Sequence, residues 1–211
     1  LVNPGAPIIY TSFARGMDMK SGNVSMACPE FGILKVALAQ MGKYLDLPIR
    51  MPSMLRDSKV LDAQAGFETG MIATVTGLMA DLMDGMQLDM DLVVDFPDLV
   101  FCDDCMAAIR RMAAKLVVDE DTLAMETMKA VGPGGTFLSQ DHTFLHFRRE
   151  LWMPKLFERR NWDLWEQDGA MDIFKVAEGK TLEMLAADPE PLLPGEVQDQ
   201  IDEVVRMAQD T

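Results

Sequence analysis

The first part of the chain alternates between short apolar runs and longer segments in which apolar residues recur every three or four positions. The runs at residues 6–10 and 47–51 predict two strands, and residues 80–87 predict a third from a weaker pattern. Between and after these runs lie three patterns typical of helices, at residues 29–45, 63–79 and 98–116. Strands that alternate with helices in this way indicate an α/β fold with a parallel sheet.

The strand pattern stops after Pro133, and the remaining segments predict helices and loops. Asp119 is placed to cap a further helix, which Gly132 and Pro133 would end. The last predicted helix, residues 196–209, has an apolar stripe, so we expect it to dock on the body of the protein. We therefore divide the chain into βα units at residues 1–118 and a helical extension at residues 119–211.

Three strand–helix units cannot close a (β/α)8 (TIM) barrel, but they could be the carboxyl-terminal part of one. Such barrels place their chemistry in the loops that follow the strands. The loop after the second predicted strand is rich in polar side chains, namely Asp57, Lys59, Asp62, Gln64 and Glu68. The alternative is an ordinary solvated loop in which Asp62 caps the next helix.

Charge and composition narrow the possible partners. The chain of 211 residues has a net charge of −15, which argues against binding to nucleic acids or to anionic membranes. No apolar run approaches the length of a membrane span, and no signal peptide is visible, so we expect a cytoplasmic protein. The first residue is Leu1, and the start of the chain reads like the interior of a domain, so we expect a preceding segment.

The cysteine pair Cys102 and Cys105 has the spacing of a redox or metal motif. The residues between them are Asp103 and Asp104, whose carboxylates would raise the thiol pKa values, whereas a redox motif needs these lowered. We therefore interpret both as buried or half-buried helix cysteines. The odd cysteine count agrees with reduced thiols.

Several sequence blocks resemble one known family. In chain order they are "NPGAPIIY", "MDMKSGN", "CPE", "DSKVLDAQAGFE" and "VGPGGTFLSQDHTFLHFRRELWMPKLFERR". Together they are similar to the carboxyl-terminal part of the trimethylamine methyltransferase family, which includes relatives that act on glycine betaine. The resemblance implies a (β/α)8 barrel that transfers a methyl group from a tertiary or quaternary amine to the cobalt of a separate corrinoid protein. It implies no tightly bound cofactor in this chain.

The resemblance also suggests roles for individual residues. A quaternary ammonium has a fixed positive charge and no donors, so aromatic faces and carboxylates suit it. We expect the substrate to be bound by side chains that follow the first two strands, namely Tyr10, Phe13, Asp57, Asp62, Gln64 and Glu68. Lys59 and His142 are candidates for a side that faces or gates the corrinoid. The catalytic residues are not identified by the sequence.

The segment at residues 132–169 gathers histidines, tryptophans and arginines. His142 and His146 lie one helical turn apart, but the sequence places no third ligand near them, so we assign no metal. We expect the three tryptophans to anchor the extension on the barrel and the arginines to pair with acidic residues. Unpaired strand edges favour self-association, so we also expect a homo-oligomer.

Two other classes of function stay open. A binding module could recognise quaternary amines without turnover, and a purely structural fragment would keep only the core pattern. Ligand titration separates the structural fragment from the other two, and methyl transfer to cobalt(I) separates enzyme from binder.

Overall fold

Three parallel segments form the sheet at the centre of the fold. The computed structural model describes residues 3, 5–187 and 193–209. Strand β3 (Arg50–Pro52) pairs in parallel with β4 (Leu82–Asp84), with Met51 opposite Met83. Tyr10 forms a parallel bridge with Ile49 on the other side of β3. Tyr10, β3 and β4 thus lie side by side in chain order, which confirms the predicted parallel sheet.

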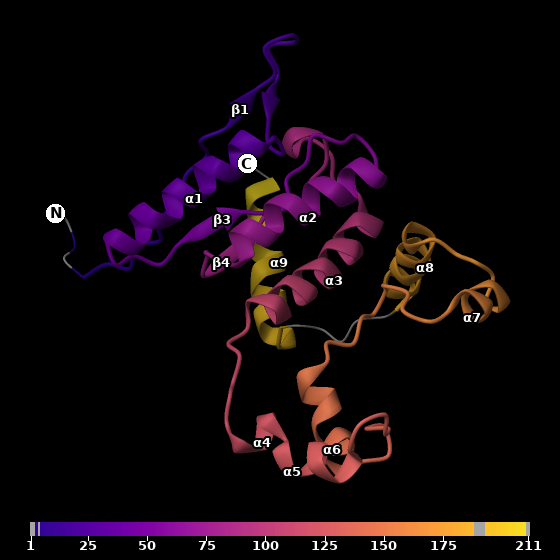
Figure 1. Cartoon of the computed structure of the whole chain (residues 1–211). Helices are drawn as coiled ribbons and strands as arrows, with labels where there is room; N and C mark the ends of the chain where they lie inside the picture. The colour runs from indigo at the N-terminus through magenta and orange to yellow at the C-terminus, as the bar shows by residue number, and fades with distance from the viewer. Residues whose placement is uncertain (1–2, 4, 188–192, 210–211) are drawn as a thin grey trace.

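Three helices connect and cover these segments, and they confirm the predicted helical patterns to within a few residues. They are α1 (Pro29–Tyr44), α2 (Ala63–Gly77) and α3 (Phe96–Ala113). Pro29 occupies the first turn of α1, where its missing N–H costs nothing. Side chains cap the other two helices. The helices α1, α2 and α3 pack in sequence (Figure 1).

Helices α1 and α2 pack against one face of the sheet. Ile49 and Met51 belong to a buried cluster with Ala39 of α1, and Met83 lies against Gly77 of α2. Side chains alternate across a strand, so Arg50 and Asp84 lie on the opposite face. We call this face, on which the side chains of Arg50 and Asp84 stay partly exposed, the open face.

The first predicted strand is shorter than expected. Among the described residues of the run at 6–10, only Tyr10 is paired. Ile8 is 62% exposed and Ile9 is 56% exposed. An apolar run favours a strand, but a strand needs a partner. Residues 6–9 come before Tyr10, the point at which this segment meets Ile49, directly before β3.

A short hairpin was missed in the loop that follows Tyr10. Strands β1 (Gly16–Met17) and β2 (Val24–Ser25) pair antiparallel. The turn is built by Asp18, whose carboxylate accepts hydrogen bonds from the backbone N–H groups of Lys20 and Ser21. Two-residue strands have too little pattern to be read from a sequence.

The helical extension begins with short elements. As predicted, Asp119 caps α4 (Glu120–Leu123), and its carboxylate accepts from the Thr122 N–H at 2.8 Å. Ala124 adopts a left-handed φ of 51°, which separates α4 from α5 (Met125–Val131). The next two helices are α6 (Asp141–Glu150) and α7 (Trp162–Gln167). Figure 1 shows α4, α5 and α6 set apart from α1, α2 and α3.

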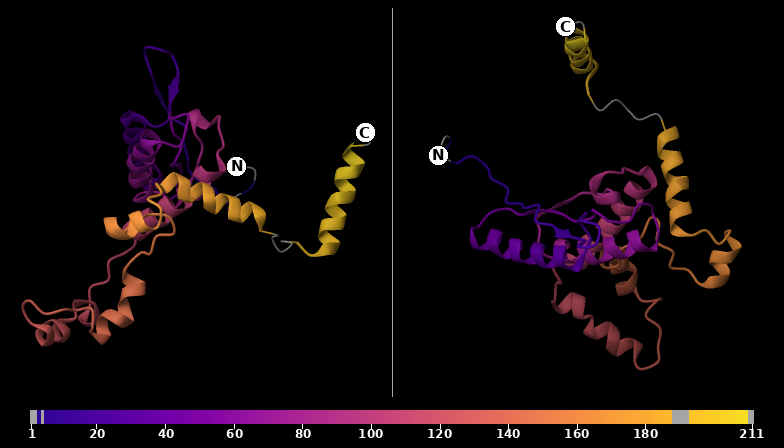
Figure 2. Two further views of the ribbon diagram at one scale, coloured as in Figure 1. Left: turned by 90° about the vertical axis from the view of Figure 1, so that its right-hand side faces the viewer. Right: turned by 90° about the horizontal axis from the view of Figure 1, so that it is seen from above.

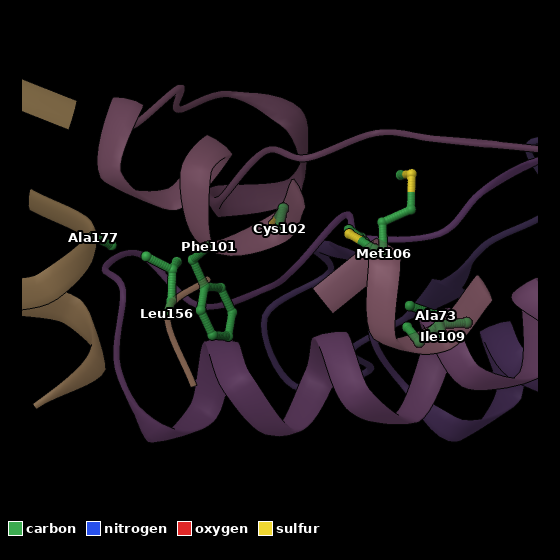
Figure 3. Close-up of a cluster of buried hydrophobic side chains, with 8 residues drawn as sticks. Ala73, Phe101, Cys102, Met106, Ile109, Leu156 and Ala177 are labelled. Atoms are coloured by element: carbon green, nitrogen blue, oxygen red, sulfur yellow. The ribbon is translucent and has the colours of Figure 1, made fainter. Parts of the chain in front are cut away.

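Helix α8 (Ile173–Ala186) is the part of the extension that packs on the βα units, through α3. One buried cluster contains Phe101 of α3, Ala177 of α8, and Leu156 from the loop between α6 and α7. Phe101 and Leu156 lie next to each other in this cluster (Figure 3). Trp162 is 66% exposed and contacts Trp165 within α7, with the two rings tilted by 60°, so the prediction that it anchors the extension is wrong. Trp152 does reach the cluster, since it lies against Phe157, which lies beside Phe101 of α3. Aliphatic residues and phenylalanines make the other contacts.

The last helix, α9 (Gly195–Gln209), is not docked on the body. Its apolar stripe is exposed, with Ile201 at 43% and Val204 at 66%. Figure 2 shows α9 apart from the other helices in both views. The expectation of a docked helix is therefore wrong, because an apolar stripe indicates that a helix needs a cover without indicating what covers it. No helix in the described ranges is long and apolar enough to cross a membrane.

Candidate functional site at the carboxyl ends of the strands

The loops that follow the three parallel segments are tied together by side chains. Asp57 joins the second loop to the first, since its carboxylate accepts from the Met26 N–H at 2.8 Å and from the Ser25 hydroxyl. Lys59 joins the second loop to the third, with its Nζ 3.0 Å from Asp89 Oδ1. Asp57 and Lys59 therefore link the three carboxyl-end loops, whereas their predicted roles toward substrate and corrinoid stay predictions.

Glu68 lies at the centre of this network and is 7% exposed. Its Oε2 accepts from the backbone N–H groups of Asp57 at 2.9 Å and of Ser58 at 3.1 Å. Its Oε1 accepts from Gln64 Nε2 at 2.6 Å. A buried carboxylate that receives several donors needs no cation beside it. Glu68 and Gln64 thus hold the loop after β3 onto α2.

Asp62 is the N-cap of α2. Its Oδ1 accepts from the Ala65 N–H at 2.9 Å and from the Ser58 hydroxyl at 3.0 Å. These hydrogen bonds lower the pKa of the Asp62 carboxyl below its usual value, and the bond from the Ala65 N–H has the largest effect. The alternative interpretation of Asp62 as a helix cap is confirmed.

Arg56 and Asp98 form a fully buried ion pair that the sequence did not suggest. Arg56 Nη1 lies 2.6 Å from Asp98 Oδ1, and Nη2 contacts the other carboxylate oxygen. Arg56 Nη1 also donates to the Thr69 hydroxyl at 3.3 Å. The pair joins the loop after β3 to both α2 and α3. The signal in the sequence was an arginine directly after an apolar run.

The cysteine pair on α3 lies near this ion pair. Burial raises the pKa values of both thiols, that of Cys105 to about 12. Cys102 donates to Asp98 Oδ1 at a sulfur–oxygen distance of 3.7 Å. Both thiols stay protonated at neutral pH, which agrees with the structural interpretation of these cysteines.

The two aromatic residues predicted to bind substrate lie in different surroundings. The Tyr10 ring packs on α1, where a Cβ added at Gly42 would be 3.1 Å from its Cδ1. Phe13 is 46% exposed, with the guanidinium carbons of Arg15 and Arg50 at 5.3 Å and 5.5 Å from its ring centre. The structure therefore does not bring Tyr10 and Phe13 together as one aromatic wall.

Charged residues that the sequence did not indicate lie on the open face of the sheet and on α1. Arg50 and Asp84 form an ion pair there, with side chains 29% and 33% exposed. Lys35 of α1 is 1% exposed, and its Nζ donates to the Ser12 carbonyl at 2.7 Å and lies 4.3 Å from the Phe31 ring centre. The signals were a charge inside a strand pattern and a lysine one turn after Phe31 on the apolar face of a helix.

The loop after β4 has an unusual backbone. Asp89, Met90 and Asp91 have φ values of 49°, 58° and 79°, in the left-handed region that favours glycine. The turn is held by the Asp89 N–H, which donates to the Ser58 carbonyl at 2.8 Å, and by the Met90 N–H, which donates to the Arg56 carbonyl at 2.8 Å. The loop after β3 therefore supports the strained turn.

His142 lies elsewhere, on α6, and does not join the loops at the carboxyl ends (Figure 1). His142, His146 and Asp121 place possible ligand atoms within 4.8 Å of one another, so Asp121 supplies a third ligand that the sequence did not place. However, the His142 Nε2 lies 2.8 Å from the Asp121 carbonyl, and Arg149 donates to His146 Nδ1 at 2.9 Å. A guanidinium only donates, so the proton of a neutral His146 lies on Nε2. These hydrogen bonds compete with metal binding.

The arginines of this segment divide into two groups. Arg149 and Arg160 pair with acidic residues, as predicted. Arg148 lies over Phe147 and Arg159 over Trp152. Cation–π contacts of this kind were not foreseen.

Comparison with known proteins gives one consistent picture. A family model described as trimethylamine methyltransferase (MTTB) matches residues 1–210. The chain is 32% identical over 199 residues to the glycine betaine methyltransferase of Desulfitobacterium hafniense (strain Y51), covering 93% of this chain and 41% of that protein. It is also 32% identical over 197 residues to the trimethylamine methyltransferase MttB of Desulfitobacterium hafniense (strain DSM 10664 / DCB-2), covering 91% and 39%.

An archaeal relative extends the comparison. The chain is 28% identical over 190 residues to the trimethylamine methyltransferase MttB of Methanosarcina thermophila, covering 88% of this chain and 38% of that protein. The chain thus spans about two fifths of the length of the curated relatives it matches.

Proposed function

Because the chain belongs to the trimethylamine methyltransferase family, we propose that the full-length protein moves a methyl group from a tertiary or quaternary amine to the cobalt of a separate corrinoid protein. The relatives named for trimethylamine and for glycine betaine support a methylated amine as substrate. The partners under this proposal are the amine and the corrinoid protein. A cytoplasmic location and self-association stay predictions.

The proposed chemistry needs little from protein side chains. The electron pair of cobalt(I) forms the new cobalt–carbon bond while the carbon–nitrogen bond breaks, and its electrons remain on the amine that leaves. The protein has to hold the methyl carbon in line between nitrogen and cobalt and to exclude water. A rigid set of loops at the carboxyl ends of a barrel suits this task.

The observation that carries the proposal is the joining of three successive loops through Asp57, Glu68 and Lys59 at one edge of a parallel sheet. The order Tyr10, β3, β4 is that of consecutive strands in a barrel. We propose that these units are the carboxyl-terminal part of a (β/α)8 barrel completed by the segment that the longer relatives possess. Asp57, Asp62, Gln64 and Glu68 then act as positioning residues, with the open face as the substrate side.

The test is methyl transfer by the full-length protein. Purified protein is mixed with a cob(I)alamin-loaded corrinoid protein and, in separate reactions, trimethylamine, tetramethylammonium and glycine betaine. We expect methylcobalamin to form from at least one amine, measured by absorbance and by mass spectrometry of the demethylated product. Binding of an amine without any methylcobalamin would support the binding module instead, and the absence of both would support a structural role.

A further inference from the structure

A group of cationic side chains lies around Phe13. Arg15 and Arg50 place their guanidinium carbons at 5.3 Å and 5.5 Å from the centre of this ring. Lys35 approaches from α1, where its Nζ is bonded to the carbonyl of Ser12, the residue before Phe13. Three cations thus meet at the point where the first parallel segment leaves the sheet.

The group has too few carboxylates to balance these cations. Asp84 pairs with Arg50 and also attracts Lys35, whereas in the described ranges no salt bridge is found for Arg15 or for Lys35. Burial, followed by repulsion from Arg15 and then Arg50, lowers the pKa of Lys35 to about 8. An excess of positive charge is unusual in a chain with a net charge of −15. It is the arrangement that an anionic ligand group would stabilise.

The shape of the group also fits an anion. Guanidinium groups present paired N–H donors that match the two oxygens of a carboxylate. Arg50 lies on the open face, and Arg15 is exposed beside it, so both can be reached by a small molecule. The ring of Phe13 already lies beside two guanidinium groups, which makes it a poor cage for a bare quaternary ammonium.

We propose that Arg15, together with Arg50, binds the carboxylate of a substrate that carries both a quaternary ammonium and a carboxylate. This inference rests on the proposed function, because it names the substrate class of that same site. A trimethylammonium ion has only positive charge and is disfavoured beside the group. A zwitterion places its carboxylate on the arginines and leaves its methyl groups free for transfer.

The test measures binding by calorimetry to the full-length protein without cobalamin. The probes are glycine betaine and tetramethylammonium, which share the quaternary nitrogen and differ in the carboxylate. We expect glycine betaine to bind more tightly, and Arg15→Gln to weaken its binding by about tenfold without weakening that of tetramethylammonium. Arg15→Lys keeps the charge and should retain part of the affinity. Arg110→Gln, which removes an exposed arginine of α3, is the matched control and should change nothing.

Equal weakening of both probes by Arg15→Gln, or no weakening of glycine betaine, would overturn the proposal. Slower methyl transfer to the corrinoid protein with unchanged glycine betaine binding would also overturn it, because Arg15 would then act in contact with the corrinoid protein and not with the substrate. Failure of the proposed function gives a different result, since glycine betaine would bind in an Arg15-dependent way while no methylcobalamin forms. Thermal unfolding of each variant confirms that it is folded.

Discussion

Arg56 and Asp98 form a two-pronged ion pair with no solvent exposure, which fastens the loop after β3 to the first turn of α3. The two residues are separated by the whole of α2 and β4 in the sequence, so the pair joins successive βα units. A charge buried in this way depends completely on its partner.

Replacing Arg56 by methionine should therefore lower the free energy of unfolding by about 3–5 kcal/mol, because Asp98 would be left buried and unpaired. Urea unfolding of the full-length protein measures this change. Replacing Arg56 by methionine and Asp98 by leucine together should recover part of the loss. A cost for Arg56→Met no greater than that of the exposed control Arg110→Met would contradict the prediction.

Glu68→Gln tests the network below the site. The substitution keeps the size of the side chain but replaces one carboxylate oxygen by an NH₂ group. In one orientation this group would face the N–H groups of Asp57 and Ser58, and in the other it would lose the hydrogen bond from Gln64. We expect a loss of about 1–3 kcal/mol in the free energy of unfolding. Glu178→Gln on α8 is an exposed control that should cost almost nothing. If both variants unfold at the same urea concentration, Glu68 does not hold the loop.

Asp62→Ala should cost about 1 kcal/mol of stability, because the first turn of α2 would lose its side-chain cap. Asp62→Asn should keep most of the stability, since asparagine also accepts from the helix N–H groups. Thermal unfolding of both variants provides the comparison. Loss of methyl transfer in Asp62→Asn at unchanged melting temperature would instead assign Asp62 a role in the reaction.

Lys35 gives a prediction for pH dependence. Burial first, then the positive charges of Arg15 and Arg50, lower its pKa to about 8 in the folded state from the ordinary lysine value of 10.5. Below pH 8 both states hold the proton, and between pH 8 and 10.5 the folded state releases it first. The unfolded state then binds more protons, so the free energy of unfolding should rise with pH across this window, by about 1–2 kcal/mol once solvent screening is allowed for.

The measurement is the difference in unfolding free energy between the unchanged protein and Lys35→Met at several pH values. This difference should move in favour of the unchanged protein as the pH rises from 8 to 10. Lys43→Met, at an exposed position of the same helix, should show no such trend. A difference that does not vary with pH would mean that Lys35 keeps an ordinary pKa.

The sequence predicted the helices around the sheet well, because their patterns are long and their ends are marked. Pro29 and Asp62 mark the starts of α1 and α2, and the structure places both helices there. The pattern failed for residues 6–9, which are apolar and yet unpaired in the part of the chain that the structure describes. It also failed for α9, since a helix pattern does not include the surface that covers it.

The polar loop after β3 could be predicted as a functional edge, but the roles of its side chains could not. Spacing alone does not distinguish a carboxylate that binds a ligand from one that caps a helix, as Asp62 does, or one that binds loop N–H groups, as Glu68 does. Arg50, Asp84 and Lys35 were missed because they lie within apolar patterns, where single charges are easily read as interruptions.

The attachments of the loop after β3 restrict how ligands can reach the site. Its backbone N–H groups at residues 57 and 58 are bonded to Glu68 on α2, and Arg56 is held by Asp98 on α3. A segment fixed to two helices cannot swing open as a lid, and its amide hydrogens should exchange slowly with solvent. Movement that admits a substrate must therefore come from another element, such as the exposed tip of the β1–β2 hairpin at residues 17–23, which lies beyond the hydrogen bonds from Ser25 and Met26 to Asp57.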